Sequence, residues 1–185
     1  MADSCFTADL EYLAARLSLD ILEHEEILEV VEGVADPTKY PDMLVHYVGT
    51  SDALERALCS FRAYLTDAGV TVPDQQEAVW PVVQHHLSRI VAGEVSPAQG
   101  LRSFKLDLWD FLLSKGSSSE YVGAFYGVET LVGLYWARDD LLERDHLTDE
   151  LKDLLQQKWP ADVSEAAKHW LDTYGERSKM EPSEA

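Results

Sequence analysis

The sequence predicts an all-α protein: an irregular bundle of six to eight helices in a single domain. Apolar residues recur at steps of three and four through most of the 185 residues, which is the spacing of one helix face. Proline, glycine and short polar capping residues divide these stretches into helix-sized pieces. No stretch of useful length alternates apolar and polar residues in the manner of a strand.

The N-terminal part predicts one or two helices between residues 9 and about 34. Its first apolar residues share one helical face: Leu10, Leu13, Ala14 and Leu17. We expect Ser18 or Asp20 to cap a second helix, because short polar side chains accept hydrogen bonds from the first free amides. Residues 35–49 contain two prolines and a glycine, and are expected to form an irregular connection.

Three helices are expected in the middle of the chain. The signals that bound them are Ser51 or Asp52 with Gly69, residues 72–74 with Gly93, and Ser96-Pro97 with Leu113. Pro81 falls inside the second. We expect it in a first turn or at a kink, because proline lacks the amide hydrogen that a helix interior needs.

The C-terminal part predicts three more helical stretches, over residues 121–137, from Thr148 to a stop at Trp159-Pro160, and over residues 163–174. The helices around Trp109 and Val128 are apolar on most sides, so they are expected at the centre of the bundle. Residues 1–175 are then one domain, and the polar residues 176–185 are expected to be a disordered tail.

Net charge is the unusual feature of the composition. The chain has 34 acids and 15 bases, a formal charge of −19. Such a field attracts basic partners and repels nucleic acid and anionic lipid, so neither nucleic acid nor a membrane is expected as a partner. The N-terminus lacks the features of a secretory signal, and Cys5 and Cys59 lack metal-site spacing. We therefore expect a cytoplasmic protein with free thiols.

The leading functional hypothesis is a non-enzymatic, acidic protein-binding module. Small bacterial immunity proteins, antitoxins and inhibitors that neutralise a basic partner are similar in charge and size. The expected contact is an acidic helix face with no base on it, joined by aromatic residues near loops or kinks. These residues are Glu23, Glu25, Glu26, Glu29, Glu32, Tyr40, Tyr47 and Trp80.

A metal-dependent helical enzyme is the first alternative. Asp139, Asp140 and Glu143 fall on adjacent helical turns and could hold Mg²⁺ through oxygen ligands. Their spacing resembles the metal motif of isoprenoid synthases, although no second acidic motif matches it. Glu143 and His146 also fit the Glu-x-x-His of di-iron bundles, which normally occurs twice. The other interpretation is a charged helix end with ordinary surface acids.

Glu129 is a candidate buried acid, because it lies in the middle of the apolar run 121–137. A buried carboxylate needs a partner or a proton, so Glu129 either faces a pocket or occupies a narrow exposed edge. Gly123 and Gly127 in the same run predict close packing of one helix on another. His86 falls on an apolar face, where a hydrogen-bonded core histidine is expected.

Nucleophile elbows and phosphate-binding loops are absent from the sequence. We therefore favour a protein without enzymatic activity and without a cofactor. A third hypothesis is a structural homodimer joined by the apolar helices.

Overall fold

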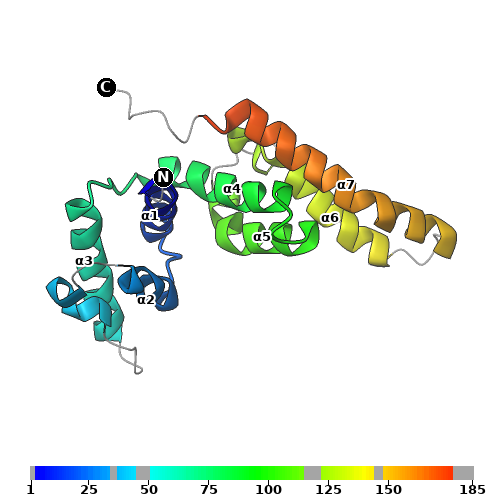
Figure 1. Cartoon of the computed structure of the whole chain (residues 1–185). Coiled ribbons are helices and arrows are strands. Elements are labelled where there is room, and N and C mark those ends of the chain that lie inside the picture. The colour runs from blue at the N-terminus through cyan, green and yellow to red at the C-terminus, as the bar shows by residue number, and fades with distance from the viewer. Residues whose placement is uncertain (1–2, 34–36, 45–50, 115–121, 144–147, 177–185) are drawn as a thin grey trace. The chain divides into compact units, whose positions relative to one another are not determined.

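The computed structural model of the chain describes residues 3–33, 37–44, 51–114, 122–143 and 148–176. These residues form seven α-helices and three short 3₁₀ helices, with no strand among them (Figure 1). The predicted all-α class and the helix number are confirmed. The elements are α1 (Asp3–Ser18), α2 (His24–Glu32), η1 (Pro37–Lys39), η2 (Pro41–Leu44), α3 (Ser51–Asp67), α4 (Gln75–Val91), α5 (Pro97–Ser114), η3 (Ala124–Tyr126), α6 (Glu129–Glu143) and α7 (Asp149–Tyr174).

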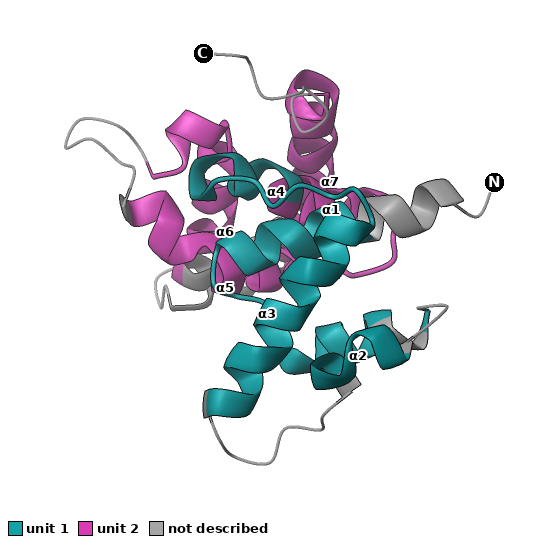
Figure 2. Cartoon of the chain, turned by 90° about the vertical axis from the view of Figure 1, so that its left-hand side faces the viewer, with its two compact units in different colours: residues 1–81 teal, residues 82–185 magenta. Residues whose placement is uncertain are grey.

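The chain divides into two compact units, unit 1 with residues 1–81 and unit 2 with residues 82–185 (Figure 2). The division falls after Pro81, inside α4. Pro81 itself lies in the interior of this helix and not in its first turn. The expectation of one domain over residues 1–175 stays a prediction. The expected tail, apart from residue 176, lies outside the described residues.

Unit 1 has a hydrophobic core built from α1, α2, η2 and α3. The four residues predicted to share a face of α1 are buried in it. Ile27, Met43, Phe61 and Leu65 are fully enclosed. Burial of each such side chain contributes roughly 1.5–3 kcal/mol, so this cluster is the main source of stability in unit 1.

The connection between α1 and α2 differs from the prediction. Asp20 has a positive φ of 56° and does not cap a helix. The Ser18 hydroxyl donates to the carbonyl oxygen of Pro73 at 2.8 Å instead. The start of α2 is capped from within, because the Glu26 carboxylate accepts a hydrogen bond from the backbone amide of Glu23 at 2.9 Å.

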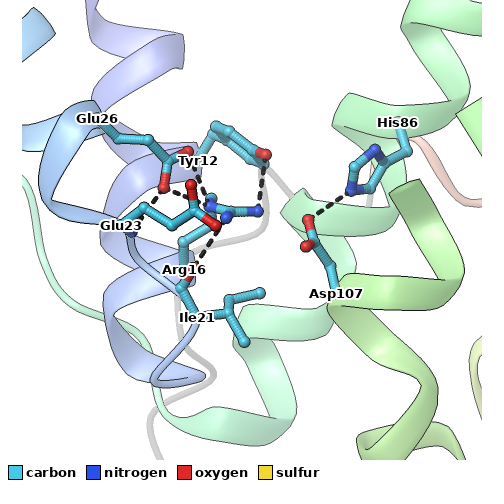
Figure 3. A network of polar contacts seen from close by, with 7 residues as sticks. All are labelled: Tyr12, Arg16, Ile21, Glu23, Glu26, His86 and Asp107. Atoms are coloured by element: carbon cyan, nitrogen blue, oxygen red, sulfur yellow. Dashed lines mark hydrogen bonds and ion pairs between the residues drawn. The ribbon is translucent and has the colours of Figure 1, made fainter. Parts of the chain in front are cut away.

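Arg16 holds this connection in place (Figure 3). Its side chain projects from α1 and is buried, with 6% of the residue exposed. The guanidinium forms an ion pair with Glu26 at 2.9 Å and donates to the Ile21 carbonyl at 2.8 Å and to the Tyr12 hydroxyl at 3.2 Å. One planar donor group thus joins α1, the turn and α2.

Substitution Arg16→Ala is expected to lower the free energy of unfolding by about 3 kcal/mol, because it leaves the half-buried Glu26 without its cation. Urea denaturation followed by circular dichroism measures the change. Arg62→Ala is the control, because Arg62 is an exposed base of the same unit. Equal losses in the two variants would show that the Arg16 contacts contribute no special stability.

Unit 2 is organised by α5, α6 and α7, which contact one another. A capping box starts α5, with the Gln99 amide donating to the Ser96 hydroxyl and the Ser96 amide donating to the Gln99 side chain. Two buried indoles fix α7, since Trp159 Nε1 donates to the Leu134 carbonyl and Trp170 Nε1 to the Tyr126 carbonyl, each at 2.8 Å. The remaining core residues of the unit include Leu87, Leu101, Phe104, Leu108, Leu112, Val128, Leu131 and Val163.

The predicted close packing of helices at Gly123 and Gly127 is wrong. Both glycines have a positive φ, 83° and 67°, and they flank η3 in a connection that precedes α6. A positive φ is accessible to glycine at little cost, whereas a side chain makes it unfavourable. The spacing of the two glycines therefore serves a turn.

The predicted end of a helix at Trp159-Pro160 is also wrong, because α7 continues through both residues. Proline inside a helix costs about 3 kcal/mol, since it removes one amide hydrogen and crowds the preceding turn. The indole hydrogen bonds of Trp159 and Trp170 hold the helix on both sides of Pro160. Tertiary contacts here outweigh a local helix-breaking signal.

The expectation that the helices around Trp109 and Val128 are enclosed at the centre is wrong in part. Val128 is fully buried, but it precedes α6. On α5, Leu106 is 74% exposed and Leu113 is 48% exposed, and on α6 Trp136 is 41% exposed. Each helix has one buried face, and the extra apolar residues face solvent.

Substitution Gly127→Ala is expected to destabilise unit 2 more than Gly69→Ala destabilises unit 1, by about 1 kcal/mol or more. Both glycines have a positive φ, but only at Gly127 would a Cβ atom meet the ring of Tyr174, at 2.5 Å. Urea denaturation of the two variants separates backbone strain from overpacking. A smaller loss at Gly127 would contradict the crowding.

Candidate functional site

The predicted acidic face lies on and beside α2. Glu23, Glu25 and Glu29 are exposed, as the sequence predicted. Glu26 is half-buried. Its carboxylate forms an ion pair with Arg16 and accepts a hydrogen bond from the Glu23 amide, so it does not belong to the exposed face. The side chain of Glu32 lies outside the described residues.

The basic residues of unit 1 are few and mostly engaged. The unit contains 16 acids and 4 bases, a formal charge of −12, against −7 for unit 2. Three of these bases form ion pairs within the unit: Arg16 with Glu26, Lys39 with Asp67, and Arg56 with Asp42 and Asp52. The exposed glutamates of α2 therefore retain their charge toward solvent.

Tyr40 was predicted as a partner contact, and this prediction is wrong. Only 7% of the residue is exposed, and its ring packs edge-to-face on Tyr64 at 5.3 Å. Its hydroxyl donates to Asp67 at 2.5 Å, beside the Lys39 ammonium at 2.6 Å. Trp80 is half-buried, and Tyr47 lies outside the described residues.

Lys39, Tyr40 and Asp67 form a coupled polar cluster that links η1 to the end of α3. Hydrogen bonds from Lys39 and Tyr40 hold the pKa of Asp67 below its ordinary value of 3.8. Conversely, the hydrogen bond to Asp67 raises the pKa of Lys39 and that of Tyr40. The cluster therefore favours ionised Asp67 with protonated Lys39.

The proposed metal ligands are described only in part. Asp140 is exposed, whereas the side chains of Asp139 and Glu143, and all of His146, lie outside the described residues. Within the described part of the chain, no group of three or more His, Cys, Asp or Glu side chains is placed to hold a metal ion. The alternative based on these residues thus gains no support.

Glu129 is not a buried acid. It is the exposed first residue of α6, so the candidate role in a pocket is wrong. The sequence misled because the apolar run appeared to be one helix, whereas the turn at η3 places Glu129 at a helix start. A carboxylate is stabilised there by the helix dipole.

Buried His86 forms a hydrogen bond with half-buried Asp107, and the sequence predicted the role of the histidine but not its partner. The imidazole Nε2 lies 2.9 Å from Asp107 Oδ2, and His86 is 5% exposed (Figure 3). The expectation of a hydrogen-bonded core histidine is confirmed. The pair joins α4 to α5, and the separation of twenty-one positions in the sequence concealed the partner.

The sequence analysis did not predict a cluster of Lys105 with aromatic rings, which lies where α5 contacts α6. The Lys105 ammonium lies 4.5 Å from the ring centroid of Trp136, 4.6 Å from that of Tyr135 and 5.7 Å from that of Trp109. Such cation–π contacts fix a lysine without a carboxylate. Part of this cluster could have been predicted from the sequence, since Lys105 and Trp109 are four residues apart on one helix and Tyr135 and Trp136 are adjacent.

Comparison of the chain with protein families, curated proteins and solved structures finds no match. Among the helices of the described ranges, none has the length and apolar character needed to cross a lipid bilayer. The site must therefore be judged from its own geometry and charge.

The Asp67 cluster predicts a defined pH dependence. Since its pKa is lowered in the folded state, Asp67 stabilises unit 1 above pH 3.8, and this contribution disappears as the pH falls through the lower folded-state pKa. Asp67→Asn should be less stable than the native chain at pH 7, with the difference shrinking below about pH 4. Urea midpoints from pH 7 to pH 3 test this. Glu55→Gln, an exposed change on the same helix, should show no such trend.

Proposed function

We propose that the chain is a non-enzymatic binding protein that holds a basic protein partner through the acidic surface of unit 1. The surface is defined by Glu23, Glu25 and Glu29, the exposed acids of α2 and of the residue before it. Bacterial immunity proteins and inhibitors that neutralise a basic partner act in this way, and the analogy is one of charge and size.

One observation carries the proposal. Three of the four bases of unit 1 are engaged by other acids, so the glutamates of α2 face solvent with a surplus of negative charge. Charges of one sign on a surface accelerate encounter with an oppositely charged partner, by factors of about 10 to 1,000. The attraction acts over a Debye length of about 8 Å at physiological salt, so it is sensitive to ionic strength.

The position of the surface is fixed by the fold. Glu26 is anchored by the buried Arg16, which sets the rotation of α2 and leaves its neighbours exposed. A preformed surface binds with little loss of conformational entropy, because the backbone is already ordered. The Arg16 contacts thus support binding without touching the partner.

Of the two alternatives, a structural homodimer has one specific observation in its favour. Leu106 and Leu113 of α5 are large apolar side chains exposed to solvent. The metal-dependent enzyme has none among the described residues.

The test compares two triple variants that remove the same charge. Glu23→Gln, Glu25→Gln and Glu29→Gln together are expected to slow association with the partner at least tenfold at low salt. Glu150→Gln, Glu165→Gln and Asp172→Asn, all exposed on α7, are expected to change it less than threefold. The partner is first isolated on the tagged native chain from its source cells, at low salt, and the rates are measured by surface plasmon resonance.

The proposal requires that the isolated partner be basic and that added salt weaken its binding. A partner of acidic or neutral character contradicts it. Equal effects of the two triple variants also contradict it, because they would reflect net charge and not this surface. Circular dichroism of both variants excludes loss of the fold as the cause.

A further inference from the structure

The outer face of α5 carries an unbroken exposed stripe at helical spacing. Its members all lie on one side of the helix: Gln99, Arg102, Ser103, Leu106, Asp110 and Leu113. The opposite face is buried and contains Leu101, Phe104, Leu108 and Leu112. The two exposed leucines are therefore surplus to the core of unit 2.

The exposed leucines are the first reason to expect a covering surface. Leu106 is 74% exposed and lies at the middle of the stripe, and Leu113 is 48% exposed two turns later. Apolar side chains grouped on one helix face and rimmed by polar residues mark an interaction site more often than isolated ones do. The spacing of the stripe is also that of one helix seam packed on another.

The charges of α5 are the second reason. The helix contains two bases and two acids, in a chain of net charge −19. Asp107 is paired with His86, and Lys105 lies among aromatic rings. Arg102 and Asp110 remain exposed, and neither forms an ion pair with another described residue.

Arg102 and Asp110 cannot satisfy each other within one helix. Eight residues separate them, which corresponds to about 12 Å along the axis. Each, however, is four residues from Leu106. A two-fold axis through Leu106 that pairs antiparallel helices therefore sets Arg102 of one copy opposite Asp110 of the other, and the same pair forms again across the axis.

We propose that the outer face of α5 binds a second copy of this chain, in an antiparallel contact centred on Leu106 and flanked by two Arg102–Asp110 pairs. The self-complementary charges select a copy of the chain over other occupants. Because α5 has as many bases as acids, two strongly acidic chains repel each other less at this helix than at an acidic segment. The contact is independent of the acidic surface of unit 1.

Sedimentation equilibrium of the full chain at 0.15 M salt tests the proposal. The native chain should show a monomer–dimer equilibrium. Leu106→Glu should raise the dimer dissociation constant roughly thirtyfold, the effect of losing a central apolar contact. Leu154→Glu makes the same change at a leucine that is 62% exposed on α7, and should leave the constant unchanged.

Exchanging the charges of Arg102 and Asp110 tests whether these two residues pair across the axis. Arg102→Asp and Asp110→Arg should each weaken the dimer roughly tenfold, because each places like charges opposite one another. The double variant should restore the constant to within about threefold of the native value, since the pairs re-form with reversed signs. Asp110→Arg lowers the net negative charge, so weakening there cannot come from general repulsion.

Three results would overturn the proposal. A native chain that stays monomeric up to the solubility limit excludes the contact. A dimer that withstands Leu106→Glu uses another face. A double variant no tighter than the single ones shows that Arg102 and Asp110 do not meet across the axis.

Discussion

The buried guanidinium of Arg16 is the interaction on which the organisation of unit 1 depends. One planar group contacts the Tyr12 hydroxyl of α1, the Ile21 carbonyl in the turn that follows and the Glu26 carboxylate of α2. A guanidinium suits this position because its five N–H donors have a fixed planar arrangement. An ammonium has three donors on one atom and lacks this planar arrangement. The direction of α2, and hence the exposure of its glutamates, follows from this contact.

The distribution of charge gives the two units different characters. In unit 1 three of the four bases form ion pairs within the unit, so the acids dominate its surface. In unit 2 aromatic rings surround the ammonium of Lys105, and the imidazole of His86 forms a hydrogen bond with Asp107. Repulsion among like charges lowers stability at low ionic strength, and the apolar cores of both units must offset it.

Local signals predicted the helices whose ends are made by neighbouring residues. Asp74 accepts hydrogen bonds from the amides of residues 76 and 77, and Ser96 accepts one from the amide of Gln99, so the helix starts predicted at residues 72–74 and at Ser96 are made by local caps. The sequence did not predict hydrogen bonds between residues far apart in the chain. Arg16 donates to Glu26 across a turn, and Tyr40 donates to Asp67, which is twenty-seven residues away. The exposed glutamates of α2 followed from helical spacing, but the loss of Glu26 and Tyr40 from the site depended on tertiary contacts.

The tryptophans are unequally divided between the two units, so most of the intrinsic fluorescence comes from unit 2. Trp109, Trp136, Trp159 and Trp170 belong to unit 2, and Trp80 is the one indole of unit 1. Intrinsic emission excited at the red edge of absorption therefore reports chiefly on the second half of the chain. Changes around α1, α2 and α3 call for tyrosine absorption or a dye attached at the exposed thiol of Cys59.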